Sequence, residues 1–266
     1  MLDDISTTAS SGSIIRIGCA GLPSGVARAS YFERLDLLEV DMTFYEPPSE
    51  AALRRWRKEA PSNAGFSMLA WQVITHEPGP SGYERLSKPI PPDHRGKLGF
   101  FRDTDEVRDA WQRTLGAARA LQAEVIVFQT PPSFSPSEVN RGAMRRFFSQ
   151  VIEGTEGIRL AWEPRGLWEP EQAVRFAEEL GIIAAFDPLQ IEGPIPEADQ
   201  AYFRLHGLGL FRNKISDEKL DELAEIVEEY ERALVLFANV EKYPDAQRFR
   251  KLLASRAYVE EQESLP

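Results

Sequence analysis

The chain has 266 residues, of which 42% are apolar and 27% charged, and its formal net charge at pH 7 is −11. A chain of this length buries a sizeable core without disulfides. Its acidic balance argues against nucleic acid as a partner, because binding phosphates calls for an excess of Lys and Arg.

One cysteine, Cys19, excludes an intramolecular disulfide and a Cys-rich metal site. No apolar run approaches the roughly 20 residues of a membrane span, so we expect no membrane partner. Residues 1–13 lack the apolar region of a signal peptide and predict a flexible polar tail. We therefore expect an acidic cytoplasmic protein.

Short runs rich in β-branched and aromatic residues alternate with helix-forming stretches along the chain. The runs predict eight strands, at 14–19, 37–44, 64–73, 124–129, 158–163, 182–186, 201–205 and 234–239. The intervening stretches predict helices at 50–59, 105–121, 141–153, 169–180 and 216–230. The last of these helices begins after Ser216, whose hydroxyl can cap the free N–H groups of the first turn.

Eight strands alternating with helices, with no break in composition, predict an α/β chain with a (β/α)8 TIM-barrel-like fold. We expect a single domain over residues 14–258 and a C-terminal tail at 259–266. The alternative is an open doubly wound sheet, which normally carries G-x-G-x-x-G in its first turn, and this chain lacks that motif.

Two segments interrupt the alternation. Residues 76–104 are rich in Pro, Gly and charge and are too long for a simple connection. Residues 187–200 contain three prolines and cannot hold a full helix, so we expect the barrel to be irregular around its sixth and seventh strands.

Polar residues interrupt the apolar strands in the second half of each run, as in the motifs LLEVDMTFY, RLAWEPRGLW and AYFRLHG. In a TIM barrel this is the carboxyl end, where catalytic groups collect. The pattern predicts a site at that end, drawn from Glu39, Asp41, Thr43, Gln129, Glu163, Arg165, Asp187, Tyr202, Arg204, His206 and Asn239.

These residues also have structural interpretations. Glu39 with Arg204, or Glu163 with Arg165, can be internal ion pairs that hold strands in register. His206 can be a hydrogen-bonded core histidine. Trp168 can belong to the core or stack on a ligand ring.

The order of the motifs IRIGCAG, EVDMTFYEPP, ITHEP, VFQTPPSF, AWEPRGLW, YFRLHG and LFANV resembles the DUF72 family of YecE-like proteins over residues 14–254. The spelling AWEPRG is similar to the archaeal branch of that family. The resemblance implies a TIM-barrel-like fold and no established activity. The motif positions that it carries over are Glu39, Thr43, Tyr45, His76, Gln129, Glu163, Arg165, Trp168, Tyr202, Arg204, His206 and Asn239.

The chain departs from the family pattern at three places. Leu69 stands where many members have a third-strand Lys, Ala238 replaces the first Asn of F-N-N, and Asp41 stands where others often have Asn. If the missing Lys carries chemistry in the family, this chain either lacks that chemistry or supplies it with another group.

The leading hypothesis is an enzyme that performs acid–base chemistry, by hydrolysis or isomerisation, on a small sugar-like or anionic substrate. Glu39 and Glu163 would form the catalytic pair, one with a pKa raised by the neighbouring acids, and His206 would transfer a proton. Arg165 and Arg204 would bind an anionic group. The other expected substrate-binding residues are Asp41, Thr43, Tyr45, His76, Gln129, Trp168, Asp187, Tyr202 and Asn239.

Two alternatives stay open. We predict no cofactor, but a divalent metal could be held by His76, Glu163, Asp187 and His206. The chain could also be a non-catalytic barrel that binds a metabolite, or a protein partner through residues 76–104.

Overall fold

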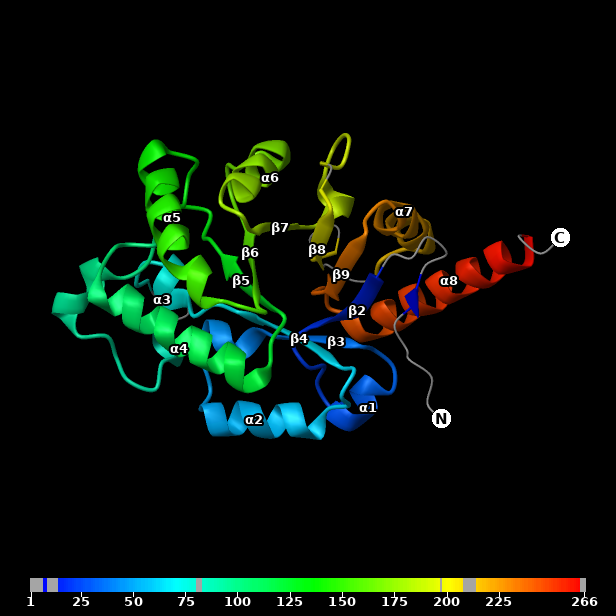
Figure 1. Ribbon diagram of the computed structural model, residues 1–266, viewed down its shortest axis with the longest axis horizontal. Helices are drawn as coiled ribbons and strands as arrows, with labels where there is room; N and C mark the ends of the chain where they lie inside the picture. The colour runs from blue at the N-terminus through cyan, green and yellow to red at the C-terminus, as the bar shows by residue number, and fades with distance from the viewer. Residues whose placement is uncertain (1–6, 9–13, 80–82, 197, 208–213, 264–266) are drawn as a thin grey trace. The chain divides into compact units, whose positions relative to one another are not determined.

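The computed structural model describes residues 7–8, 14–79, 83–196, 198–207 and 214–263. One sheet holds the strands in the order β1 to β9, and β9 also pairs with β2 (Figure 1). The short strand β1 is antiparallel to β2, whereas β9 runs parallel to β2. Strands β2 to β9 thus have the closed order of a (β/α)8 barrel, and the predicted fold class is confirmed.

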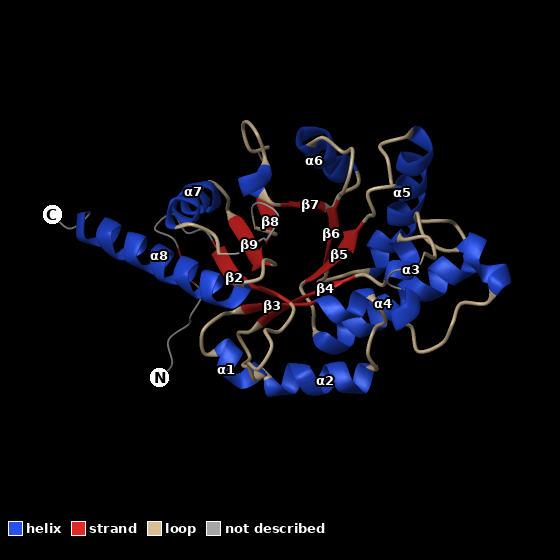
Figure 2. Cartoon of the chain, turned by 180° about the vertical axis from the view of Figure 1, so that it is seen from behind, coloured by secondary structure: helices blue, strands red, loops and turns tan. Residues whose placement is uncertain are grey.

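Helices alternate with the strands along most of the chain (Figure 2). The strands are β1 (Thr7–Thr8), β2 (Ile14–Ala20), β3 (Leu37–Val40), β4 (Gly65–Leu69), β5 (Val125–Gln129), β6 (Arg159–Glu163), β7 (Ile183–Phe186), β8 (Gln200–Leu205) and β9 (Arg232–Phe237). The α-helices are α1 (Arg28–Phe32), α2 (Glu50–Glu59), α3 (Gln72–Thr75), α4 (Asp105–Leu121), α5 (Glu138–Val151), α6 (Pro170–Glu179), α7 (Asp217–Glu228) and α8 (Lys242–Glu263). The 3-10 turns are η1 (Asp41–Phe44), η2 (Tyr83–Arg85), η3 (Pro92–Lys97), η4 (Ile152–Gly154) and η5 (Pro188–Gln190).

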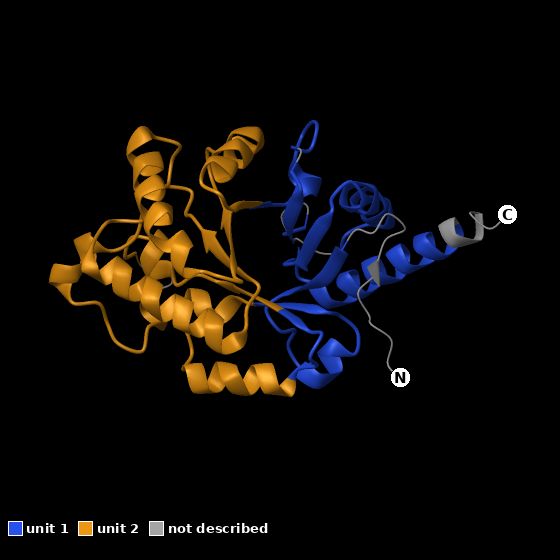
Figure 3. Cartoon of the chain, in the orientation of Figure 1, with its two compact units in different colours: residues 1–39, 60–65, 185–266 blue, residues 40–59, 66–184 orange. Residues whose placement is uncertain are grey.

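The chain divides into two compact units (Figure 3). Unit 1 comprises residues 1–39, 60–65 and 185–266, and unit 2 comprises residues 40–59 and 66–184. The unit boundaries cut β3 after Glu39 and β7 after Ala184, so the units share strands of the sheet.

Unit 1 is built on β2, β8 and β9, whose registers pair Ile17 with Val235 and Phe203 with Val235. These strands are buried along most of their length, as expected of parallel strands covered on both faces. Helices α7 and α8 pack in the same unit, and Ser216 caps α7 by accepting a hydrogen bond from the Lys219 N–H at 3.3 Å, as predicted. Helix α8 continues to Glu263, into the stretch where the sequence predicts a tail from 259.

Unit 2 has an aromatic core around Phe128 of β5. The rings of Trp111, Phe147 and Phe148 lie 5.9, 5.7 and 5.2 Å from the ring of Phe128. These side chains project from α4 and α5, so burial of their rings fixes both helices on the strand.

Two predicted strands are too long. The strand predicted at 37–44 ends at Val40, and residues 41–44 form η1. The strand predicted at 64–73 ends at Leu69, and α3 begins at Gln72. The Thr43 hydroxyl explains the first difference, because its oxygen lies 2.7 Å from the carbonyl oxygens of both Val40 and Leu69 and holds the chain in a turn.

The predicted irregularity of the barrel after β7 is confirmed. Among the described residues between Phe186 and Gln200, the structure has only the turn η5, which Asp187 caps by accepting from the Leu189 N–H at 3.2 Å. The missing helix follows from the prolines of this segment. Across the described residues, no helix combines the length and the apolar character that crossing a membrane requires.

Asp36 of unit 1 immediately precedes β3 and is hydrogen-bonded to Ile17 of β2. Its Oδ1 accepts a hydrogen bond from the Ile17 N–H at 2.8 Å, and its own N–H donates to the Ile17 carbonyl at 3.3 Å. Burial raises the pKa of Asp36 to about 6, although the Ile17 N–H and the charges of Arg250 and Arg16 oppose the rise. The folded protein therefore binds this proton more tightly than the unfolded chain does.

We expect the free energy of unfolding to fall as pH rises from about 4 through 6, because the buried Asp36 carboxyl must ionise over that interval. Asp36→Asn keeps the acceptor oxygen and removes the charge. It should raise the free energy of unfolding at pH 7 by up to about 3 kcal/mol, since one pKa unit corresponds to roughly 1.4 kcal/mol. Urea unfolding at pH 4 and pH 7 measures both effects, with the exposed Asp109→Asn as the control. Equal pH dependence in the wild type and Asp36→Asn would contradict the assignment.

Candidate functional site

The predicted site residues divide between the two units. Unit 1 contains Glu39, Asp187, Tyr202, Arg204, His206 and Asn239. Unit 2 contains Asp41, Thr43, Tyr45, His76, Gln129, Glu163, Arg165 and Trp168.

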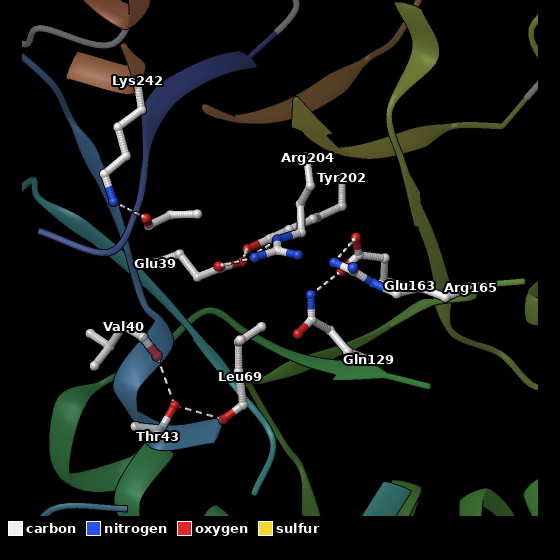
Figure 4. A network of polar contacts seen from close by, with 11 residues as sticks. Glu39, Val40, Thr43, Leu69, Gln129, Glu163, Arg165, Tyr202, Arg204 and Lys242 are labelled. Carbon is white, nitrogen blue, oxygen red and sulfur yellow. Dashed lines mark hydrogen bonds and ion pairs between the residues drawn. The ribbon is translucent and has the colours of Figure 1, made fainter. Parts of the chain in front are cut away.

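In unit 1, β3 and β8 bring Glu39, Tyr202 and Arg204 together (Figure 4). Arg204 contacts both carboxylate oxygens, with its Nη2 2.8 Å from Oε1 and its Nε 3.1 Å from Oε2. The Tyr202 hydroxyl donates to Oε2 at 2.8 Å. Glu39 is fully buried and Arg204 is 4% exposed. The predicted alternative of an internal Glu39–Arg204 ion pair is therefore confirmed.

Burying a carboxylate and a guanidinium costs solvation free energy that only good geometry and further hydrogen bonds offset. Glu39 obtains both, from the two-point contact with Arg204 and from the Tyr202 hydroxyl. With both carboxylate oxygens engaged and no exposed surface, Glu39 holds β3 and β8 in place rather than facing solvent.

Asp187 follows β7 and joins its end to the end of β8. It accepts hydrogen bonds from the Gln190 amide at 2.6 Å and from the backbone N–H of His206 at 2.8 Å. Burial raises the pKa of Asp187, and the bonds from His206 and Gln190 oppose the rise. His206 thus contributes its backbone to this contact, while its side chain is half-buried.

Asn239 follows β9 and supports the start of α8. Its amide nitrogen donates to Asp245 Oδ2 at 2.7 Å, and Asp245 is fully buried. Asp245 also accepts from the Ile215 N–H at 2.9 Å and from Arg248 at 2.7 Å. The amide nitrogen of Asn239 is therefore used in holding α8 and the residues before α7 together.

The sequence did not single out Lys242. Its Nζ donates to the carbonyl oxygen of Ala20 at 2.5 Å, at the end of β2, and the side chain is half-buried (Figure 4). Strand periodicity could not reveal this lysine, because it opens a helix five residues after β9 ends.

In unit 2, Gln129 and Glu163 end neighbouring strands and are paired in the register of β5 and β6. The Gln129 amide donates to Glu163 Oε2 at 2.5 Å, and Arg165 Nη2 lies 3.4 Å from Oε1 (Figure 4). The Glu163 side chain is 5% exposed, whereas that of Arg165 is 39% exposed. A buried carboxylate therefore lies beside a guanidinium that reaches solvent.

The loops that follow these strands interlock. The Thr130 N–H donates to the Glu163 carbonyl at 3.1 Å. Gly166 has φ +83, and a Cβ there would lie 2.5 Å from the Pro132 carbonyl oxygen. Only glycine satisfies both the left-handed backbone and the close approach. The motifs QTPP, after β5, and EPRG, after β6, therefore form two turns that pack against each other, and this packing fixes Glu163 and Arg165.

His76 follows α3 in the same unit. Its Nδ1 lies 2.8 Å from the Thr75 hydroxyl oxygen, and the edge of its ring contacts Phe44 with the ring centroids 4.9 Å apart. Burial, together with the charge of Arg165, lowers the pKa of His76 to about 4. His76 is therefore a neutral imidazole at physiological pH.

Other predicted residues of unit 2 have structural contacts. Thr43 is fully buried in the turn described above. The Trp168 indole N–H donates to the Phe134 carbonyl at 2.8 Å, and its ring packs against Trp162 and Phe176. Trp168 thus belongs to the core, which is one of its two predicted interpretations.

Asp41 begins η1, and Tyr45 follows its end. The carbonyl of Tyr45 accepts from the Trp71 indole N–H at 2.8 Å, and its ring lies under the Arg85 guanidinium at 4.1 Å. Asp41 is exposed at the start of η1. Its predicted place on a strand face is wrong, because the strand has already ended at Val40.

Nowhere in the described ranges do three His, Cys, Asp or Glu side chains form a group that could hold a metal ion. The four ligands considered from the sequence are divided, with His76 and Glu163 in unit 2 and Asp187 and His206 in unit 1.

The family described as "Protein of unknown function DUF72" matches residues 20–266. No curated protein matches the chain. A DUF72 family protein of Enterococcus faecalis has a similar structure, with a TM-score of 0.64 and 16% identity over 91% of this chain and 98% of that chain. For a DUF72 family protein of Thermotoga maritima the TM-score is 0.61 and the identity 18%, over 90% of this chain and 99% of that chain.

A D-psicose 3-epimerase solved in the presence of D-fructose is also similar in structure. Its TM-score is 0.53 and its identity 13%, over 91% of this chain and 98% of that chain. Identities this low show a shared fold and nothing of the reaction.

We expect Arg204→Met to destabilise the protein by about 3–5 kcal/mol, because it leaves the Glu39 carboxylate buried without its counter-ion. Urea unfolding at pH 7 measures the loss. The control is Arg175→Met, which removes an exposed ion pair with Glu171 on α6 and should cost less than about 1 kcal/mol. Similar losses in the two variants would show that the Glu39–Arg204 pair does not support the fold.

Proposed function

This chain belongs to the DUF72 family of proteins of unknown function, and from that premise we propose that it is an enzyme performing acid–base chemistry on a small sugar-like or anionic substrate. Glu163 is the residue that moves the proton. The observation that carries the proposal is a cluster in unit 2. In it the buried Glu163 carboxylate contacts the Gln129 amide and the partly exposed Arg165 guanidinium, whose charge helps to lower the pKa of His76.

Each member of the cluster has a chemical role in this proposal. Gln129 holds one oxygen of Glu163 and so fixes the direction of the carboxylate. Arg165 contacts the other oxygen at 3.4 Å and, being 39% exposed, has donors for a carboxylate, a phosphate or a carbonyl oxygen of the substrate. His76 is neutral, so one ring nitrogen can accept a proton or a hydrogen bond from the substrate while the other donates a hydrogen bond.

The same geometry favours Glu163 over Glu39 as the proton-moving group. Glu39 is fully buried and bonded to Arg204 and Tyr202, whereas Glu163 adjoins a side chain that solvent reaches. We therefore assign Glu39 a supporting role, and the two-carboxylate arrangement of glycoside hydrolysis is not part of the proposal. Transfer of a proton between the two carbons next to a carbonyl group, as in aldose–ketose isomerisation, can be performed by a single well-placed base on one face of the substrate.

The structural likeness to a D-psicose 3-epimerase is compatible with this chemistry but supports only the fold. The choice of a sugar-like or anionic substrate depends on the donors of Gln129 and Arg165 and on the neutral His76.

A second candidate function is the binding of a partner through residues 76–104. One observation favours it, a surface hollow of about 500 Å³ in this segment, lined in part by Tyr83, Pro89, Ile90 and Arg95. A binding protein of this kind would show no turnover that depends on Glu163.

We expect Glu163→Gln to fold like the wild type and to lose turnover by about 10²–10⁴-fold, the usual contribution of a general acid or base. The assay incubates wild type and variant in D2O with aldoses, ketoses and their phosphates, and follows deuterium incorporation and product formation by NMR. Thermal unfolding followed by circular dichroism checks the fold.

Glu171→Gln on the exposed face of α6 is the matched control and should turn over at the wild-type rate. Full activity of Glu163→Gln on a substrate of the wild type would remove Glu163 from the mechanism. Absence of any wild-type turnover across the panel would favour the binding function.

A further inference from the structure

Helix α3 has four residues, Gln72 to Thr75, and His76 follows directly at its C-terminus. A helix of one turn is not stable alone, since it fixes several backbone dihedrals for one or two internal hydrogen bonds. Its last carbonyl groups also need donors from elsewhere. Whatever supplies those donors determines where His76 lies.

Residues 98–102, the end of the long Pro-rich segment, supply three of the donors. The N–H groups of Gly99, Phe101 and Phe100 donate to the carbonyls of Val73, Ile74 and Thr75 at 2.8, 2.9 and 3.2 Å. From the other part of the segment, the Tyr83 hydroxyl donates to the carbonyl of His76 itself at 2.7 Å. Every carbonyl from residue 73 to residue 76 is thus bound by this segment.

The backbone of residues 99–101 has an unusual conformation. Gly99, Phe100 and Phe101 have φ values of 77, 52 and 52°, so three consecutive residues are left-handed. This conformation is unfavourable for the two phenylalanines and persists only where the surroundings enforce it. Here it turns three successive N–H groups toward α3.

Close packing adds to the hydrogen bonds. A Cβ on Gly99 would lie 2.4 Å from the carbonyl carbon and oxygen of His76. Arg102 donates to the carbonyl of Leu98 at 2.5 Å and forms an ion pair with Glu77, the residue after His76, at 2.5 Å. Phe101 is 1% exposed and packs on Phe128 and Phe148, so the segment is fixed to the core of unit 2.

We propose that residues 98–102, together with Tyr83, form a positioning element that holds the His76 ring in one orientation. This inference rests on the proposed function, in which His76 exchanges protons with the substrate. By fixing the Thr75 and His76 carbonyls, the element fixes the Thr75 hydroxyl against Nδ1 of His76. Nε2 is then the ring atom available to act on a substrate.

The test follows the ring nitrogens of His76 by NMR. The chain has three histidines, so protein labelled with ¹⁵N in its histidine rings gives three pairs of signals, and a His76→Asn variant identifies those of His76. In the wild type we expect one tautomer at pH 7 and a pKa of His76 near 4.

Tyr83→Phe removes one hydroxyl and should leave the fold intact. We expect its His76 signals to show a mixture of tautomers, and the pKa of His76 to rise by about half a unit or more, because water beside a less firmly held ring reduces the effect of burial. Gly99→Ala forces the two backbones apart and should produce a larger change in the same direction. The signals of His94 and His206 should not move.

Ser87→Ala is the matched control. Ser87 lies in the same segment but is bonded to Glu46 and not to α3, so His76 should titrate as in the wild type. Wild-type tautomer and titration in both Tyr83→Phe and Gly99→Ala would overturn the positioning role. The measurement needs no substrate, so its outcome is separate from the turnover of Glu163→Gln, which tests the proposed function.

Discussion

A buried carboxylate needs hydrogen-bond donors in place of water, and in each unit polar residues at the strand ends surround such a group. Glu39 is a buried carboxylate of unit 1, and Tyr202 and Arg204 are its donors. Glu163 is a buried carboxylate of unit 2, and Gln129 and Arg165 are its donors. The cost of desolvation makes these partners obligatory. It accounts for the placement of charged side chains in strands that are otherwise apolar.

The two carboxylates differ in what surrounds them. Around Glu39 the partners Tyr202 and Arg204 are buried as well, so this contact stabilises the packing of β3 and β8. Around Glu163 one partner, Arg165, is partly exposed, and its charge adds to the burial that keeps the His76 imidazole neutral. A side chain with a shifted pKa beside a solvent-exposed group is typical of functional sites. An ion pair whose members are both buried is typical of structural ones.

The alternation of strands and helices and the polar residues at strand ends could be predicted from the sequence, because both depend on local periodicity. The pairs Glu39–Arg204 and Glu163–Arg165 could also be named as candidates. The further donors to these carboxylates, Tyr202 and Gln129, could not, since Glu39 and Tyr202 are 163 positions apart. Periodicity also failed after Val40 and Leu69, where the Thr43 hydroxyl and the donors from residues 98–102 impose turns on apolar sequence. Lys242 and the packing of Gly99 on His76 depend on tertiary contacts that no local pattern records.

The interlock between Gly166 and Pro132 has a consequence for protein engineering. Because the turn after β5 and the turn after β6 touch through backbone atoms, neither has room to change length or gain a side chain independently. Grafting from a relative with another specificity therefore has to transfer residues 129–134 and 163–168 together as a single cassette. Libraries that randomise one turn alone will mostly sample chains in which the other no longer fits.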